Sequence, residues 1–141
     1  ADQAFGTVVS LCAEREETWI SLRIQSLYQA LHDQGHAHSV EVFWQGELVG
    51  GLYGVSIGRI FHGESMFHTR SDASKVGFVS LVERLKASGY VLIDCQMPTP
   101  HLASLGAGGV RRSDFLKALS MERDQAPAAE AWVSPLFSSD P

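Results

Sequence analysis

The chain has 141 residues, of which 45% are hydrophobic and 19% charged, a composition that suits one globular domain and excludes a disordered chain. No apolar run approaches ~20 residues and the start lacks the basic and apolar regions of a signal peptide, so neither a membrane span nor secretion is expected. Cys12 and Cys95 are the only cysteines, which excludes a cysteine-based zinc cluster and favours a reduced, cytoplasmic protein.

The net charge of −5 argues against nucleic acid as a partner, but the charge is unevenly distributed. Residues 59–123 contain nine basic side chains against six acidic ones, so this window carries +3 and the remainder −8. A locally basic face can attract phosphate even in an acidic protein. Solvated helix surface explains the same residues equally well.

The first predicted element is a helix over residues 18–35. Thr18 or Ser21 can cap its start and Gly35 ends it. Its apolar residues at helical spacing are Ile20, Ile24, Leu27 and Leu31. Alternating apolar and polar residues then predict three strands, at 37–44, 48–58 and 59–68. The short turns between them favour an antiparallel meander.

A second helix is predicted over residues 72–88, capped by Ser71 or Asp72 and closed by Gly89. The residues expected on its buried face are Val76, Val79, Val82 and Leu85. A strand over 90–96 follows, then a glycine-rich turn, a last helix over 112–120 on a face of the sheet, and an extended tail from residue 126.

This order of elements is typical of α+β acyltransferases with an N-acetyltransferase (GNAT-like) fold, a mixed, mostly antiparallel sheet flanked by helices. No repeat or long linker divides residues 1–141, so a single domain is expected. In acetyl-CoA enzymes of this fold, a glycine-containing loop cradles pyrophosphate before the central helix. The corresponding turn here, "HTRSDASK", has no glycine, so acetyl-CoA fits poorly and no cofactor is expected.

The predicted strand over 90–96 ends in "DCQ", where a carboxylate and an amide leave an apolar run together. Alternation along a strand places Asp94 and Gln96 on one face and Cys95 on the other. Such a pair either caps neighbouring backbone or holds a substrate. The residues themselves leave both possibilities open.

Polar residues also interrupt the predicted strand over 59–68. Alternation puts Glu64 on one face with His62 and Met66. The residues expected on the other face are Phe61, Gly63, Ser65 and Phe67. A carboxylate in such a strand costs several kcal/mol, to an order of magnitude, unless it is paired. A salt bridge from Glu64 to Arg59 or Lys75 and a role in binding are the two explanations.

Histidines and aromatic residues in and near the first predicted helix are weaker candidates for a functional role. His32, His36 and His38 are close in sequence, but a glycine breaks the helix that would align them, so no metal site is expected. Trp19 and Tyr28 are either core anchors or stacking platforms for a base.

Several motifs together resemble the bacterial leucyl/phenylalanyl-tRNA–protein transferases. They run in order from about Phe5 to the end of the chain: "TWI", "LH..GHAHSVE", "LVGGLYGV.IG", "F.GESMF", "ASK", "LIDCQ", "HL.SLGA" and "R..FL..L". The resemblance implies transfer of Leu, Phe or Met from aminoacyl-tRNA to the N-terminal Arg or Lys of an acceptor protein. The modified protein then becomes a substrate of the N-degron pathway.

The resemblance also implies roles for individual residues. Asp94 is expected to orient Gln96, whose amide contacts the attacking amine, and Asp94 can accept a proton. Glu64 is expected to receive the cationic end of the acceptor. The apolar slot for Leu or Phe is assigned to Leu52, Phe61 and Met66, or the residues behind them. The remaining implied contacts are Trp19, Tyr28 and Ser65 for substrate and Arg70, Lys75 and Arg84 for tRNA.

Family members carry a further N-terminal domain that helps to hold the aminoacyl end of the tRNA, and this chain starts after it. The chain is therefore a piece of a longer protein, or a naturally short or split form with a missing N-terminal half. Two other functions remain open from the sequence. One is a GNAT-like small-molecule acyltransferase, and the other is a non-catalytic protein that binds N-terminal basic residues through Glu64.

Overall fold

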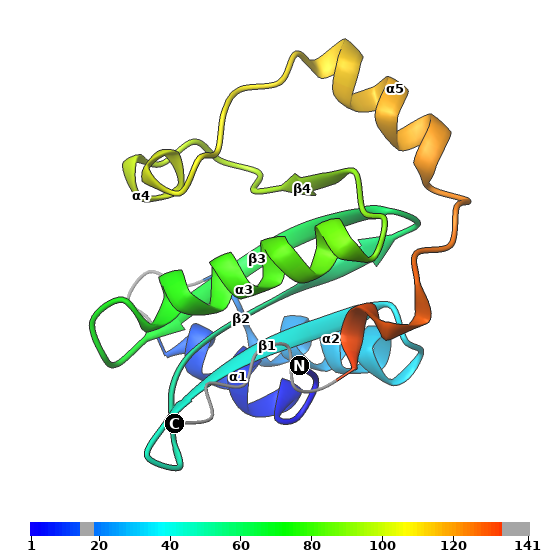
Figure 1. Cartoon of the computed structure of the whole chain (residues 1–141). Coiled ribbons are helices and arrows are strands. Elements are labelled where there is room, and N and C mark those ends of the chain that lie inside the picture. The colour runs from blue at the N-terminus through cyan, green and yellow to red at the C-terminus, as the bar shows by residue number, and fades with distance from the viewer. Residues whose placement is uncertain (15–18, 134–141) are drawn as a thin grey trace.

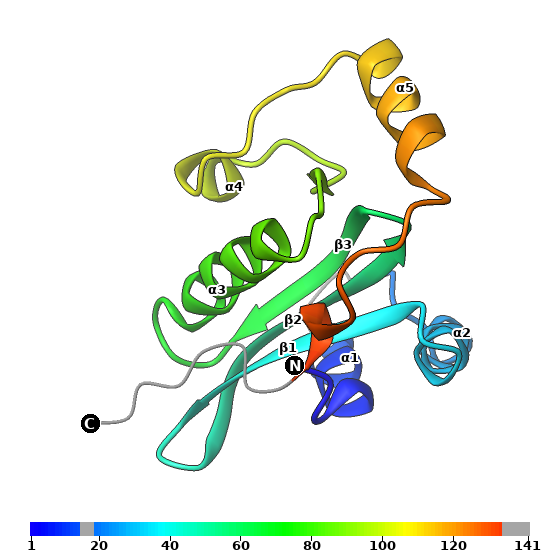
Figure 2. The same ribbon diagram turned by 45° about the vertical axis from the view of Figure 1, so that its right-hand side comes forward.

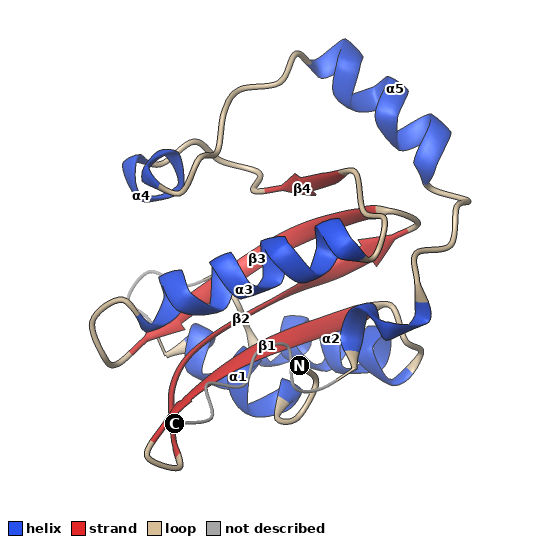
Figure 3. Cartoon of the chain, viewed as in Figure 1, coloured by secondary structure: helices blue, strands red, loops and turns tan. Residues whose placement is uncertain are grey.

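The computed structural model describes residues 1–14 and 19–133, and it is an α+β structure as expected (Figures 1 and 3). The elements in chain order are α1 (Phe5–Ala13), α2 (Leu22–Asp33), β1 (Ala37–Trp44), β2 (Glu47–Ile57), β3 (Ile60–His68), α3 (Ala73–Ala87), β4 (Leu92–Asp94), α4 (Pro100–Ser104), α5 (Arg112–Glu122) and the 3₁₀-helix η1 (Ala129–Trp132). Helix α1 was not expected, because no side chain caps its start. The predicted cap Thr18 lies outside the described residues.

The four strands form one sheet in the order β1-β2-β3-β4. The first three strands are the predicted antiparallel meander. Strand β4 runs parallel to β3, so the sheet is mixed, and the pairing extends only from Ile60↔Leu92 to His62↔Asp94. The predicted strand over 90–96 is shortened at both ends to Leu92–Asp94, and it stops before Gln96, which has a left-handed backbone with a φ of 64°.

Helices cover both faces of the sheet and create two buried clusters (Figure 2). The α1-side cluster consists of Phe5, Val8, Val9, Cys12, Ile20, Ala37, Tyr53 and Phe67. The α3-side cluster consists of Val40, Leu52, Phe61, Phe78, Leu81, Leu85, Tyr90 and Ala131. Leu52 and Tyr53 are neighbours on β2 but belong to different clusters, because successive strand residues point to opposite faces.

Helix α2 follows its predicted start and stop signals. Ser21 Oγ accepts a hydrogen bond from the Ile24 backbone N–H at 3.3 Å, and Gly35 takes a φ of 82° just after the helix. Ile24 and Leu31 pack against the α1-side cluster, whereas Leu27 is 57% exposed. The apolar stripe of α2 is therefore only partly used for the core.

Helix α3 buries only part of the predicted face: Leu85 is buried and Val82 packs against the α3-side cluster, as expected. Val76 and Val79 are about half exposed, at 51% and 52%. The buried residues are Ala73, Ser74, Gly77, Phe78, Leu81 and Leu85. Gly77 lets the helix approach the sheet closely, since a Cβ there would lie 3.0 Å from the Val42 side chain. The buried face is therefore rotated toward Gly77, Phe78 and Leu81, and Val76 and Val79 lie at its exposed side.

After β4 the chain leaves the sheet as an arch, residues 96–123, which contains α4 and α5 (Figures 1 and 2). The expectation that residues 112–120 form a helix is confirmed, but its placement on a face of the sheet is wrong, since no side chain of α5 is buried. The arch rejoins the sheet at the β2–β3 turn. There the Arg59 side chain donates from Nε to Glu122 Oε2 at 2.6 Å and its backbone N–H donates to the Glu122 carbonyl.

The tail from residue 126 was expected to be extended, but part of it forms the 3₁₀-helix η1. Ala131 is 1% exposed within the α3-side cluster. Trp132 donates from Nε1 to the Tyr90 hydroxyl at 3.0 Å and stacks on His38. Through these two side chains, η1 packs against the α3-side cluster. Residues 134–141 lie outside the described part of the chain.

Candidate functional site

The site begins with a β-bulge in β3. Tyr53 of β2 pairs with Ser65, and the next residue, Gly54, pairs with Gly63. Glu64 is therefore an extra residue in the ladder. A bulge places two successive residues on the same side of a strand and is common beside functional sites.

The bulge reverses the alternation of side chains along β3. Phe61 lies in the α3-side cluster and Phe67 in the α1-side cluster, although six residues apart on a regular strand would place them on one face. Their predicted common face is therefore wrong. So is the common face of Glu64 and Met66, because Met66 packs against the α3-side cluster. Glu64 and His62 do share a face, as expected, since both line one pocket.

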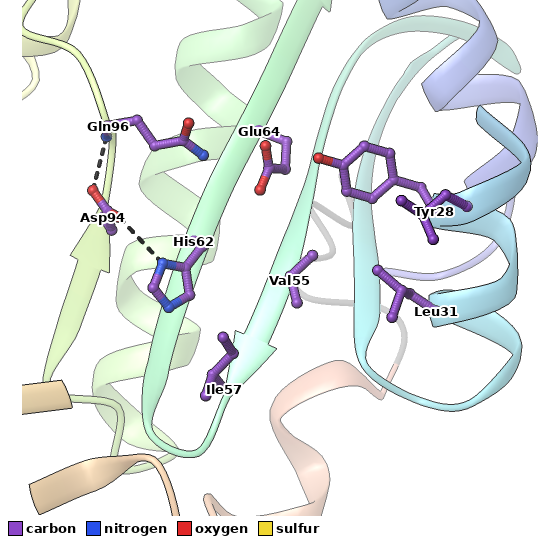
Figure 4. Close-up of a pocket in the computed structure, with 9 residues that line it drawn as sticks. Tyr28, Leu31, Val55, Ile57, His62, Glu64, Asp94 and Gln96 are labelled. Atoms are coloured by element: carbon purple, nitrogen blue, oxygen red, sulfur yellow. Dashed lines mark hydrogen bonds and ion pairs between the residues drawn. The ribbon is translucent and has the colours of Figure 1, made fainter. Parts of the chain in front are cut away.

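This pocket has a volume of about 590 Å³ and lies between α2, β2, β3 and the end of β4 (Figure 4). Its lining residues are Leu27, Tyr28, Leu31, Val55, Ile57, His62, Glu64, Asp94 and Gln96. Four of the predicted site residues meet here: Tyr28, Glu64, Asp94 and Gln96. In Figure 4, Glu64 and Tyr28 point toward each other from β3 and α2, while Asp94 and Gln96 lie on the opposite side of β3.

A closed set of hydrogen bonds, here called the polar ring, ties the end of β4 to β3. Asp94 Oδ2 lies 3.1 Å from His62 Nδ1, and Asp94 Oδ1 accepts from the Gln96 backbone N–H at 2.9 Å. Gln96 Nε2 then donates to the Gly63 carbonyl at 2.8 Å, beside His62. The capping explanation for Asp94 and Gln96 is thus realised. It leaves part of both groups available, because Gln96 is exposed and the Asp94 side chain is 26% exposed.

The Glu64 carboxylate is not neutralised by the cations expected to pair with it. Arg59 binds Glu122, and Lys75 lies 3.2 Å from Asp72. Within residues 1–14 and 19–133 no ion pair of Glu64 occurs. The salt-bridge explanation for this carboxylate is therefore wrong for the described chain, and the group faces the pocket without a cationic partner among the described residues.

The hydroxyl of Tyr28 points toward Glu64 from α2 (Figure 4). Burial raises the pKa of Tyr28 above its usual range, and the charge of Glu64 and a hydrogen bond to it raise the pKa further. Tyr28 therefore stays protonated beside the carboxylate. Trp19 is edge-on to the Tyr28 ring at 6.3 Å and is 53% exposed. Ser65 pairs with Tyr53, whose ring lies 5.1 Å from that of Tyr28.

The predicted apolar residues lie on the other face of the sheet from Glu64. Leu52 and Phe61 are 4% and 1% exposed within the α3-side cluster, and Met66 packs against them. Ile93 and Cys95 also pack against this cluster while remaining partly exposed, next to Asp94 and Gln96. Burial, followed by the Asp94 charge, raises the pKa of the Cys95 thiol. The predicted apolar residues therefore lie on the face of the sheet opposite the pocket and do not line it.

The three predicted tRNA contacts all make bonds within the chain. Arg70 lies over the Trp44 ring, 4.2 Å from its centroid, and Lys75 pairs with Asp72. Arg84 donates from Nη1 to the Glu130 carbonyl at 2.8 Å, so it helps to hold η1. None of the three lines the pocket.

Of the polar residues that line the pocket, His62 is the one to which the sequence assigned no role. It was placed on the face of Glu64, but an isolated histidine in a strand gives no signal of a partner 32 residues later.

Among the described residues, no group of His, Cys, Asp and Glu side chains is suited to hold a metal ion. In the same residues, no helix has the length and apolar character needed to cross a membrane.

Comparison with known proteins identifies the family. A family model described as leucyl/phenylalanyl-tRNA protein transferase matches residues 1–120. Proteins named leucyl/phenylalanyl-tRNA–protein transferase are 53% identical over 133 residues in Stutzerimonas stutzeri (strain A1501) and 53% identical over 137 residues in Pseudomonas fluorescens (strain Pf-5). The alignments cover 92% and 94% of this chain but 59% and 60% of the relatives, so the chain spans about three fifths of their length. The chain belongs to the leucyl/phenylalanyl-tRNA–protein transferase family.

Proposed function

We propose that this chain is the catalytic domain of a cytoplasmic aminoacyltransferase that moves Leu, Phe or Met from aminoacyl-tRNA to the N-terminal Arg or Lys of acceptor proteins. The acceptors are thereby marked for degradation by the N-degron pathway. The observation that carries the proposal is one pocket that combines the Asp94–Gln96 pair with the Glu64 carboxylate, which has no cationic partner among the described residues. The relatives, named leucyl/phenylalanyl-tRNA–protein transferases, support the donor and the protein acceptor.

We assign residues 1–141 to one domain of the GNAT-like type. The order of helix, three antiparallel strands, helix and parallel strand supports this assignment. The relatives are longer than this chain, and we propose that an N-terminal half completes the site and holds the aminoacyl end of the tRNA. Assays of activity should therefore use the chain extended by the segment that completes its relatives.

The proposed reaction needs orientation more than strong acid–base chemistry, because an aminoacyl ester is already activated. The α-amine of the acceptor attacks the ester carbonyl carbon, and the bond from that carbon to the ribose oxygen of the tRNA breaks. The proton lost by the amine passes to the departing ribose hydroxyl through Asp94 or water. Gln96 holds the amine by its amide, which the polar ring keeps in place. Such orientation can contribute about 7–11 kcal/mol to a bimolecular step.

We assign Glu64 to the cationic side chain of the acceptor. A Lys or Arg stem is apolar and its head is charged, so it matches a pocket in which Leu31 and Val55 lie beside a carboxylate. Tyr28 stays protonated beside the carboxylate and keeps it in position. Trp19 and Ser65 complete the proposed substrate-binding residues on this side of the sheet.

We assign the donor side chain to the partly exposed edge of the α3-side cluster, where Met66 is only partly buried and Leu52 and Phe61 are the buried residues behind it. The support is the partly exposed boundary of this cluster at Ile93 and Cys95, directly behind the proposed position of the amine. A β-branched donor would be excluded by shape, while unbranched Met would be tolerated. The tRNA body is assigned to Arg70, Lys75 and Arg84.

The test is the transfer of labelled Phe from Phe-tRNA to a peptide that begins with Arg. We expect transfer to the Arg peptide and to a matching Lys peptide, and no transfer to the same peptide with an acetylated N-terminus. Acetyl transfer from acetyl-CoA to a small amine would instead indicate a small-molecule acyltransferase. Binding of the Arg peptide without consumption of Phe-tRNA would indicate a non-catalytic binder.

A further inference from the structure

We propose that His62 is a positioning residue of the transfer reaction, which holds the Asp94 carboxylate in the orientation that Gln96 requires. This inference rests on the proposed function. Its starting point is the 3.1 Å contact between His62 Nδ1 and Asp94 Oδ2. A carboxylate only accepts hydrogen bonds, so the imidazole proton in this contact must lie on Nδ1.

The tertiary structure fixes the imidazole ring on several sides. The backbone of His62 is held in the middle of the sheet, since it pairs with Val55 of β2 and with Asp94 of β4. The ring of Phe115 from α5 meets the imidazole edge-on, with centroids 6.3 Å apart. The His62 side chain is only 15% exposed. A ring with so little freedom can hold its hydrogen-bond partner in one orientation.

The other imidazole nitrogen separates this role from general base catalysis. Nε2 is buried and has no hydrogen-bond partner among the described residues. In Figure 4 the ring of His62 lies below the line from Asp94 to Glu64, near Ile57. A substrate amine therefore has no direct access to Nε2. The geometry points to an action of His62 through Asp94 and not on the substrate.

Asp94 transmits this positioning to Gln96. Its second oxygen, Oδ1, accepts from the Gln96 backbone N–H at 2.9 Å, at a residue with a left-handed φ of 64°. A non-glycine residue adopts this strained region only when its surroundings hold it there. If His62 did not hold Oδ2, the carboxylate would be free to rotate and the Gln96 turn would lose its fixed acceptor. The Gln96 amide would then no longer meet the amine at one place.

The experiment compares three variants in the chain extended by the segment that completes its relatives. His62→Leu removes both nitrogens, while His62→Asn keeps an N–H donor close to the place of Nδ1. His36→Leu is the matched control, because His36 is exposed and lies outside the pocket. We expect His62→Leu to lower kcat for Phe transfer by about tenfold to a hundredfold with little change in KM for Phe-tRNA. His62→Asn should regain most of kcat, and His36→Leu should change neither constant.

A purely structural role predicts a different result, in which His62→Leu lowers Tm while kcat per folded molecule stays at the wild-type value. That outcome, or a His62→Asn variant as slow as His62→Leu, would overturn the proposal. A readout without activity is the ¹⁵N spectrum of the imidazole at a pH where the ring is neutral. Wild type should show the Nδ1–H tautomer, and Asp94→Ala should shift it toward Nε2–H. A wild-type protein that transfers no Phe would refute the proposed function, whereas the Nε2–H tautomer in wild type would refute only the role of His62.

Discussion

The body of the molecule, formed by β1–β3 with α1 and α3, is far more buried than the arch over residues 96–123. In the body, Tyr53, Phe61 and Leu81 are fully buried or nearly so. In the arch, no side chain of α4 or α5 is buried. Segments with few buried contacts open at a lower free energy than packed cores. The polar ring lies where the two regions meet, so the proposed catalytic groups depend on packing on one side and on hydrogen bonds on the other.

The largest contrast between body and arch should appear when a methyl group is added to a glycine. A Cβ on Gly54 would collide with the backbone carbonyl of His62 and the ring of Phe61. We expect Gly54→Ala to lower the free energy of unfolding by about 3 kcal/mol or more, measured by urea denaturation. Gly108→Ala in the arch meets no atom within 4 Å and should change it by less than about 0.5 kcal/mol. Equal costs would show that the arch is packed as tightly as the body.

The next effect concerns activity where the regions meet. We expect Asp94→Asn and Gln96→Glu each to lower Phe transfer to an Arg peptide by ~100-fold, as on loss of a positioned acid–base group. Each change also removes one bond of the polar ring, so Tm should fall slightly, whereas the loss of transfer should be far larger than the loss of stability explains. Near-normal turnover together with a lower Tm would mean that the polar ring only caps backbone.

A smaller effect should follow from loosening the far end of the arch. Glu122→Gln weakens the contact with Arg59 that returns the chain to the body, and the Glu122 side chain is only 13% exposed. We expect a loss of about 1 kcal/mol in the free energy of unfolding. Hydrogen exchange should rise in α5 before it rises in β2. A uniform rise across both elements would contradict the idea that the arch opens by itself.

The salt dependence of tRNA binding can show whether the basic residues of the body or those of the arch contact the tRNA. If the body meets the tRNA, Arg70→Ala and Lys75→Ala should each reduce the slope of log K against log salt by about 1. The matched changes Arg112→Ala and Lys117→Ala in the arch, both at exposed residues, should leave the slope unchanged. The reverse pattern would move the tRNA contact to the arch. Arg84 is the least informative of the proposed contacts, because its loss also releases the Glu130 carbonyl.

The smallest expected effect lies deep in the body. The Tyr53 hydroxyl is buried without a partner in the described residues, so Tyr53→Phe should leave the free energy of unfolding within about 1 kcal/mol of wild type at neutral pH. Burial raises the pKa of Tyr53, so the folded state keeps a proton that the unfolded state loses above about pH 10. Wild type should therefore lose stability as pH rises above this value, and Tyr53→Phe should lose less. If the free energy of unfolding of Tyr53→Phe fell with rising pH as steeply as that of wild type, this explanation of Tyr53 would be wrong.

Local patterns in the sequence were sufficient for most elements of the body. The meander over β1–β3 follows from alternating side chains and short turns, and α2 and α3 end at Gly35 and Gly89, which both have a positive φ. The motifs "GESMF" and "LIDCQ" identified the family and the pocket residues Glu64, Asp94 and Gln96. These features are encoded in neighbouring residues, because turns, caps and alternation act over a few positions.

The tertiary structure alone decided which side chains face one another. The bulge at Glu64 depends on how β3 pairs with β2, so strict alternation misplaced Met66 and Phe67. The bond between His62 and Asp94 joins residues 32 positions apart and exists only because β4 lies parallel to β3. The placement of α5 away from the sheet also had no local cause, since its apolar residues fit a packed helix equally well. Such contacts depend on register and approach between distant segments, which no short stretch of sequence encodes.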